Sequence, residues 1–151
     1  MSREYPDHPR VGVGAVVLHG DRILLVRRGR APSAGKWSLP GGLVRLGERL
    51  ADAVRREVAE ECGCLVRVVD VAGVVDRVIR DETGRVRYHY VLVDYLALAD
   101  TAEVAAASDA AEVRWATLEE IGSLDTTEGL SDMIHRALAL AGRRRAPSGR
   151  P

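Results

Sequence analysis

Runs of β-branched and aliphatic residues near the N-terminus predict two strands that form a hairpin. The first run covers residues 11–18 and the second covers residues 23–26. The segment between them, His19-Gly20-Asp21-Arg22, is short and polar and contains a glycine, as hairpin turns do. A short extended piece at 37–39 follows, and Pro40-Gly41-Gly42 then interrupts the extended pattern.

Apolar positions then change to a helical period. Residues 48–62 contain neither glycine nor proline, and Leu50, Val54 and Val58 recur every four residues. This spacing places the three apolar side chains on one face of an amphipathic helix. Gly63 follows directly and is typical of a helix C-cap, so we predict that the helix ends there.

The remaining pattern predicts a long hairpin and a helical C-terminus. Two β-prone runs are joined by the turn-forming segment Asp81-Glu82-Thr83-Gly84, and an alanine- and aspartate-rich loop follows the second run. The expected elements are strands over 65–79 and 85–98, a strand over 112–115, a short helix over 118–121 and a final helix over 128–141.

The order of these elements predicts one domain of the α+β class. No repeat or linker divides the chain, so we assign a single domain to residues 11–141. Residues 1–10 form an N-terminal arm. Residues 142–151 contain Arg143-Arg144-Arg145 and are predicted to be a basic, disordered tail.

Composition excludes several classes of protein. With 151 residues, of which 46% are hydrophobic and 29% charged, the chain can bury one core and is not wholly disordered. Its 22 basic and 22 acidic residues cancel, which argues against binding to nucleic acid or membrane through net charge. The two cysteines, Cys62 and Cys64, cannot supply a disulfide framework. Without an apolar signal core or spanning segment, we predict a cytoplasmic protein.

Three glutamates gather on the predicted helix. Glu57, Glu60 and Glu61 fall within an arc of about 100° at 3.6 residues per turn, so their charges repel one another. A hard divalent cation such as Mg²⁺ would relieve that repulsion. Alternatively, the cluster is a solvated face with Arg55 and Arg56 as partners.

The residues around this cluster carry a resemblance to a known family. The segment Gly42-x5-Glu48-x7-Arg56-Glu57-Val58-x-Glu60-Glu61-x-Gly63-Cys64 resembles the signature of the Nudix hydrolases. Its last position is usually aliphatic, and Cys64 is a small apolar substitute. With flanking segments such as Val113-Arg114-Trp115, the resemblance covers about residues 11–140. It implies the Nudix fold, a mixed β-sheet core sandwiched between helices (α/β/α).

The resemblance also implies a chemistry, namely Mg²⁺- or Mn²⁺-dependent hydrolysis of a nucleoside diphosphate linked to another group. Glu57 and Glu61 would be the principal ligands, and Glu60 would be a further ligand or the carboxylate that activates water. Glu48 would act from the edge of the metal shell, and Arg56 would orient the glutamates. The implied metal ligands are therefore Gly42, through its carbonyl oxygen, with Glu57, Glu60 and Glu61.

A general base outside the helix is a second possibility. In relatives it can be an acidic residue on a loop before the strand that ends in tryptophan, and here Asp109 and Glu112 precede Trp115. Both residues are otherwise solvated loop charges, and Glu60 competes with them for the role.

Candidate substrate-binding residues lie near the second predicted strand. Arg27 and Arg28 are candidates for phosphate contacts, although neighbours on a strand point to opposite faces. Trp37 is a candidate for stacking on a base, although a single tryptophan beside a glycine turn more often packs in the core.

The predicted partner is a small nucleotide, with no nucleic acid and no membrane. An ADP-ribose or nucleotide-sugar substrate is slightly favoured, although the absence of proline between Pro40 and Pro147 weakens it. The alternative is a MutT-like pyrophosphohydrolase of (deoxy)nucleoside triphosphates. A non-catalytic nucleotide sensor is disfavoured because every signature glutamate is present. Homodimers are common in such folds, and the 65–98 hairpin is the candidate interface.

Overall fold

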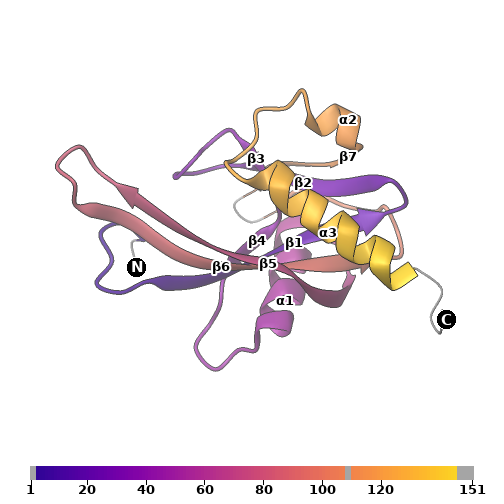
Figure 1. The fold of residues 1–151 in the computed structure, drawn as a ribbon, viewed down its shortest axis with the longest axis horizontal. Coiled ribbons are helices and arrows are strands. Elements are labelled where there is room, and N and C mark those ends of the chain that lie inside the picture. The colour runs from indigo at the N-terminus through magenta and orange to yellow at the C-terminus, as the bar shows by residue number, and fades with distance from the viewer. Residues whose placement is uncertain (1–2, 108–109, 146–151) are drawn as a thin grey trace.

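The computed structural model describes residues 3–107 and 110–145 (Figure 1). Most of the expected elements are present at or close to their predicted bounds. The elements are β1 (Arg10–His19), β2 (Arg22–Arg28), β3 (Trp37–Ser38), β4 (Gly41–Leu43), α1 (Leu50–Cys62), β5 (Val66–Arg80), β6 (Val86–Ala99), β7 (Ala110–Ala116), α2 (Leu118–Ile121) and α3 (Leu130–Arg145).

A mixed sheet joins all seven strands. Its main path runs β3-β2-β1-β6-β5, while β4 pairs with β1 and β7 pairs with β2. Strands β1 and β6 run parallel, and the other ladders are antiparallel. Strands β1 and β2 pair only beside their turn, at Leu18↔Ile23 and His19↔Arg22. Because the two strands then separate, β4 can pair with the free edge of β1 at residues 12–14.

Helices cover both faces of this sheet, as the predicted α/β/α arrangement requires (Figure 1). Alternate residues of β1 point to opposite faces. Val13, Ala15 and Val17 belong to the core beneath α1, whereas Val16 and Leu18 belong to the core beneath α3. Burial on both faces explains why this strand is an almost unbroken apolar run. No helix among the described residues is long and apolar enough to cross a membrane.

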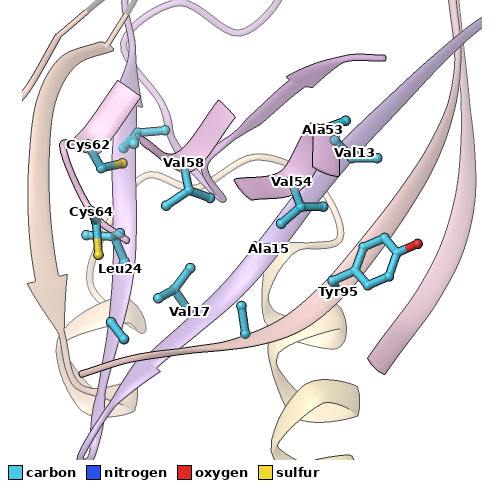
Figure 2. Close-up of a cluster of buried hydrophobic side chains, with 13 residues drawn as sticks. Val13, Ala15, Val17, Leu24, Ala53, Val54, Val58, Cys62, Cys64 and Tyr95 are labelled. Carbon is cyan, nitrogen blue, oxygen red and sulfur yellow. The ribbon is translucent and has the colours of Figure 1, made fainter. Parts of the chain in front are cut away.

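Helix α1 has the orientation that its apolar stripe predicted. Val54 and Val58 are fully buried and point from α1 toward Ala15 and Val17 of β1 (Figure 2). Gly63 ends the helix with φ of 62°, and its N–H donates to the Ala59 carbonyl. The left-handed conformation explains why glycine stands there. The buried stripe fixes the helix against the sheet and so fixes the direction of its polar face.

The long hairpin is confirmed and extends beyond the helices. Strands β5 and β6 pair from Val66↔Ala99 to Arg80↔Val86, with three shifts of register. Their connected ends project from one side of the molecule, and the N-terminal segment lies beside them (Figure 1). The outer strand, β5, exposes the apolar side chains of Val71, Val74 and Val78. The hairpin is therefore both part of the sheet and an arm that reaches past it.

The structure corrects the prediction at Pro40-Gly41-Gly42. Instead of ending extended structure, Gly41–Leu43 forms β4 and pairs with Gly12, Val13 and Gly14 of β1. A Cβ on Gly41 would lie 2.0 Å from the Val13 carbonyl oxygen, which no side chain could tolerate. Glycine at this position therefore permits the two strands to approach closely.

The predicted tail also begins too early. Helix α3 continues to Arg145, so residues 142–145 are helical, and residues 146–151 lie outside the described part of the chain. Ala141 is buried against the core, and Arg144 donates to the Asp70 carboxylate of β5 at 2.9 Å. These two contacts extend the helix beyond the end that the apolar pattern indicated.

Candidate active site

Helix α1 brings the predicted glutamates together. Glu57, Glu60 and Glu61 all line a cavity of about 290 Å³ between α1, β4 and the end of β2. Since Val54 and Val58 hold the opposite face of the helix against the sheet, the acidic face is directed at this cavity. The three glutamates therefore face one cavity, and their functional role stays a prediction.

Arg56 connects these carboxylates. Its Nε and Nη2 donate to the two Glu48 oxygens at 2.7 and 2.8 Å, and Nη2 also donates to the Leu43 carbonyl at 3.0 Å. Its Nη1 donates to Glu57 at 2.6 Å and to Glu60 at 3.3 Å. The Arg56 side chain is only 16% exposed. One guanidinium thus donates to three carboxylates. That it orients them for catalysis stays a prediction.

This network keeps Glu48 ionised. The hydrogen bond from Arg56 and the one from the Arg45 N–H lower the pKa of Glu48 to about 2. In turn, the bond to Glu48 raises the pKa of Arg56. Glu48 also accepts a hydrogen bond from the Arg45 N–H at 3.0 Å, and this bond supports the loop that leads into α1.

Strand β4 lies directly against the glutamates. The Gly41 N–H donates to Glu61 Oε1 at 2.8 Å. A Cβ on Gly42 would lie 2.4 Å from Glu57 Cδ, so any other residue there would displace this carboxylate. The two glycines therefore let a strand backbone touch two charged side chains of α1.

A larger cavity adjoins the glutamate cavity. Its volume is about 480 Å³, and it extends from β4 toward β5, β6 and the start of α3. The two cavities share five lining residues, which are Arg3, Arg28, Gly41, Gly42 and Leu43. A ligand that fills both must therefore pass between two arginines and the backbone of β4.

Two polar groups inside the larger cavity were missed by the sequence analysis. Burial raises the pKa of Asp94 to about 6, against an opposing effect of Arg77. The Tyr90 hydroxyl is buried without a hydrogen-bond partner among the described residues. Asp94 interrupts the apolar run Val91-Leu92-Val93, and this isolated charge in a core strand was the available signal.

Comparison with known proteins agrees with this geometry. The family model of the NUDIX domain matches residues 8–137, which is most of the chain. The chain belongs to the Nudix hydrolase family. The signature segment, hereafter the Nudix box, is the stretch from Gly42 to Cys64 that carries the glutamate cluster.

Individual Nudix relatives have different names. The chain is 33% identical over 117 residues to the ADP-ribose pyrophosphatase of Methanocaldococcus jannaschii, which covers 78% of this chain and 67% of that protein. It is 48% identical over 60 residues to the RNA pyrophosphohydrolase of Caulobacter vibrioides, but the match covers only 38% of this chain and 35% of that protein. The crystal structure of a MutT NUDIX hydrolase from Burkholderia pseudomallei superposes with a TM-score of 0.74 at 34% identity, covering 86% and 98% of the two chains.

The Nudix box fits a divalent metal. Nudix hydrolases generally use one, and Glu57, Glu60 and Glu61 offer the hard oxygen donors that Mg²⁺ prefers. Among the described residues, no three acidic, histidine or cysteine side chains are already gathered as a ligand set. Arg56 and the Gly41 N–H hold the carboxylates instead. Ligation by these glutamates and by the Gly42 carbonyl stays a prediction.

The predicted bases have different positions. Glu60 lines the glutamate cavity, where Arg45 lies 3.5 Å from one of its oxygens. Glu112 is exposed on β7 and forms a cross-strand ion pair with Arg27 at 3.7 Å. Asp109 lies outside the described residues. The structure thus brings Glu60, but not Glu112, into the glutamate cluster.

The predicted substrate-binding residues also separate. Arg27 lines the glutamate cavity, and the half-buried Arg28 lines both cavities, with its Nε donating to the Pro32 carbonyl at 2.6 Å. Of the two roles considered for Trp37, the structure agrees with core packing and leaves little of the ring free to stack on a base. The Trp37 side chain is only 8% exposed and packs in the core beneath α3, because β3 pairs with β2 and turns the indole inward.

Proposed function

We propose that this Nudix protein is a metal-dependent pyrophosphohydrolase that cleaves a nucleoside diphosphate linked to another moiety, with ADP-ribose or a nucleotide sugar favoured. The observation that carries this proposal is the junction of the two cavities at residues 41–43. The smaller cavity holds the acidic cluster that a cation requires, and the larger one has the space for a nucleoside or sugar.

Each polar residue of the Nudix box would have a separate role in the reaction. Bound Mg²⁺ would neutralise the diphosphate and lower the pKa of a bound water. Glu57 and Glu61 would hold the metal, and Arg56 would keep Glu57 in place. Glu60 would accept a proton from the attacking water. The water oxygen would form a new bond to one phosphorus as the bond between that phosphorus and the bridging oxygen breaks. The products would be a nucleoside monophosphate and the phosphorylated second group.

The chemistry of the larger cavity supports the favoured substrate class. Asp76, Asp94 and Glu128 line it together with Arg77, and carboxylates accept hydrogen bonds from the hydroxyl and amino groups of a ribose or sugar. A ribose or sugar therefore suits this cavity better than additional phosphates. The named activity of the M. jannaschii relative points in the same direction.

A MutT-like triphosphate substrate is the second candidate. Arg27, Arg30 and Arg45 line the smaller cavity in addition to the arginines already described, and guanidinium groups are well suited to phosphate oxygens. The B. pseudomallei structure carries the MutT name. In this alternative the triphosphate would occupy the smaller cavity, and only the nucleoside would reach the larger one.

A substrate panel would separate the two candidates. The purified protein would be incubated with Mg²⁺ and ADP-ribose, ADP-glucose, dGTP or 8-oxo-dGTP, and the products would be identified by chromatography. We expect AMP and ribose 5-phosphate from ADP-ribose at the highest kcat/KM. Release of pyrophosphate from a triphosphate at higher kcat/KM would select the MutT-like alternative.

Two variants test the catalytic assignment on the same panel. Glu57→Gln and Glu60→Gln should each lower kcat by about 100-fold, because a metal ligand or a general base is lost. Glu82→Gln is the matched control, since Glu82 is exposed in the turn between β5 and β6. If the unaltered protein and both variants hydrolyse every substrate equally slowly, the proposed activity is wrong.

A further inference from the structure

The part of the N-terminal arm that the structure describes before β1, residues 3–9, is attached to the long hairpin. The Tyr5 N–H donates to the Arg87 carbonyl of β6 at 2.7 Å, and the Tyr5 hydroxyl donates to Asp81 at 2.9 Å. Glu4 and Arg87 form an ion pair at 3.0 Å. The Arg85 guanidinium lies 4.2 Å from the centre of the Tyr5 ring. Four contacts therefore fix two consecutive residues of the arm.

The backbone of the arm shows the same restraint. Tyr5 has φ of 52°, in the left-handed region that aromatic residues rarely adopt. A segment free in solvent would relax from this conformation, so the surrounding contacts must hold it. The arm therefore has one defined path along the hairpin, and this path determines where the residue before it lies.

That path leads Arg3 to the junction of the two cavities. Arg3 lines both of them, together with Arg28 and residues 41–43. The NUDIX family match covers residues 8–137, so Arg3, Glu4 and Tyr5 lie before it, while their partners on the hairpin lie within it. This chain thus adds a cation to the site from outside the family match.

The charges at the junction suit an anion. Burial lowers the pKa of the Arg28 guanidinium; Tyr90 and Glu61 act against this, while the positive charges of Arg3 and Arg77 add to it. The two arginines at the junction therefore repel each other when nothing lies between them. A bound diphosphate would remove that repulsion, and a guanidinium can donate two parallel hydrogen bonds to phosphate oxygens.

We infer that Arg3 is a substrate-binding residue that contacts the diphosphate where the two cavities meet, and that Tyr5 is the positioning residue that holds the arm there. This inference rests on the proposed function for the identity of the ligand. The diphosphate would then lie between two positive groups. One is the metal that the glutamates would hold, and the other is the pair of guanidinium groups of Arg3 and Arg28.

Kinetics of four variants test this inference. On the best substrate of the panel, Arg3→Ala should raise KM by about tenfold or more, and Arg3→Lys should recover part of that loss because the charge remains. Tyr5→Phe removes only the bond to Asp81 and should raise KM by about threefold. Arg55→Ala is the control, since Arg55 pairs with Asp52 on the exposed side of α1. Melting temperatures should stay within about 2 °C of that of the unaltered protein.

A binding measurement without turnover separates this inference from the proposed function. Methylenediphosphonate, a diphosphate that cannot be hydrolysed, would be titrated with Mg²⁺ by calorimetry into each variant. Weaker binding by Arg3→Ala alone supports the inference even if no nucleotide on the panel is hydrolysed. Equal KM and equal diphosphate affinity in Arg3→Ala and Arg55→Ala would overturn it while leaving the hydrolase proposal intact. Failure of the unaltered protein to bind methylenediphosphonate would also overturn it.

Discussion

The two adjoining cavities are built in different ways. The smaller one takes its carboxylates from one continuous stretch, in which β4, the following loop and α1 supply Glu57, Glu60 and Glu61, although Arg3 and the end of β2 also line it. The larger one is assembled from strands β1, β4, β5 and β6 and from the segment before α3. The acidic part of the first is therefore encoded locally in the sequence, whereas the second exists only after the sheet has formed.

This difference separates chemistry from specificity. The carboxylates of the Nudix box are grouped by residues that are close to them in sequence. Helical spacing places them on one face of α1, and Gly41, Gly42 and Arg56 contact them there. The larger cavity depends on which side chains the sheet happens to bring together, such as Asp94 from β6 and Glu128 before α3. A family can therefore keep one reaction while its substrates differ, as the different names of the relatives illustrate.

Paired glycine substitutions give the largest expected contrast between the cavities. In Gly42→Ala the new Cβ would lie 2.4 Å from Glu57 Cδ, so the carboxylate must move. In Gly12→Ala the nearest atom is the movable Leu92 Cδ2 at 2.8 Å, and this site lines only the larger cavity. We expect Gly42→Ala to lower kcat by about 100-fold. Gly12→Ala should change mainly KM, by less than about fivefold.

Steady-state kinetics on one substrate measure this contrast directly. Urea unfolding of both variants is the control for folding, and the overpacking at either glycine should cost about 1–3 kcal/mol. Equal losses of kcat in the two variants would show that the cavities do not have separate roles.

Arg56→Ala tests whether the local network also stabilises the fold. Without Arg56, the carboxylates of Glu48, Glu57 and Glu60 would face one another without their shared cation. The side chain is mostly buried, so we expect a loss of about 2 kcal/mol in unfolding free energy, between the values of exposed and buried ion pairs. Mg²⁺ should restore part of this stability because it binds only the folded cluster.

Thermal unfolding with and without Mg²⁺ measures this effect. The rise in melting temperature on adding Mg²⁺ should be larger in Arg56→Ala than in the unaltered protein. Arg55→Ala, one position earlier and paired with Asp52, should show the ordinary rise. A melting temperature that does not respond to Mg²⁺ in any of these proteins would contradict metal binding by the glutamates.

The same contrast explains how far the sequence alone could lead. The apolar stripe of α1 predicted the helix, its cap and the direction of the glutamates, because each depends on neighbours within four residues. β4 was missed because its glycines look like a break until β1 lies beside them. Arg3 and Asp94 carried no recognisable spacing. Their roles depend on contacts with residues far away in sequence, which a single pattern does not contain.

The buried Asp94 predicts an unusual dependence of stability on pH. Burial raises its pKa from the ordinary 3.8 to about 6, so between these values the folded state holds a proton that the unfolded state has released. Stability from this group is present below pH 4 and is lost as the pH rises through 6. A difference of this size corresponds to about 2–3 kcal/mol.

Asp94→Asn should remove this loss, because the amide has nearly the same shape and no charge to bury. We expect the variant to be more stable than the unaltered protein by about 2 kcal/mol at pH 8, and the difference to shrink toward pH 4. Urea unfolding at several pH values measures it. Asp76→Asn is the control, since Asp76 lines the same cavity but is exposed.

A constant difference across the pH range would mean that Asp94 does not titrate between 4 and 6. If Asp94→Asn also changes KM for a nucleotide sugar but not for pyrophosphate analogues, the larger cavity is the part of the site that recognises the non-phosphate group.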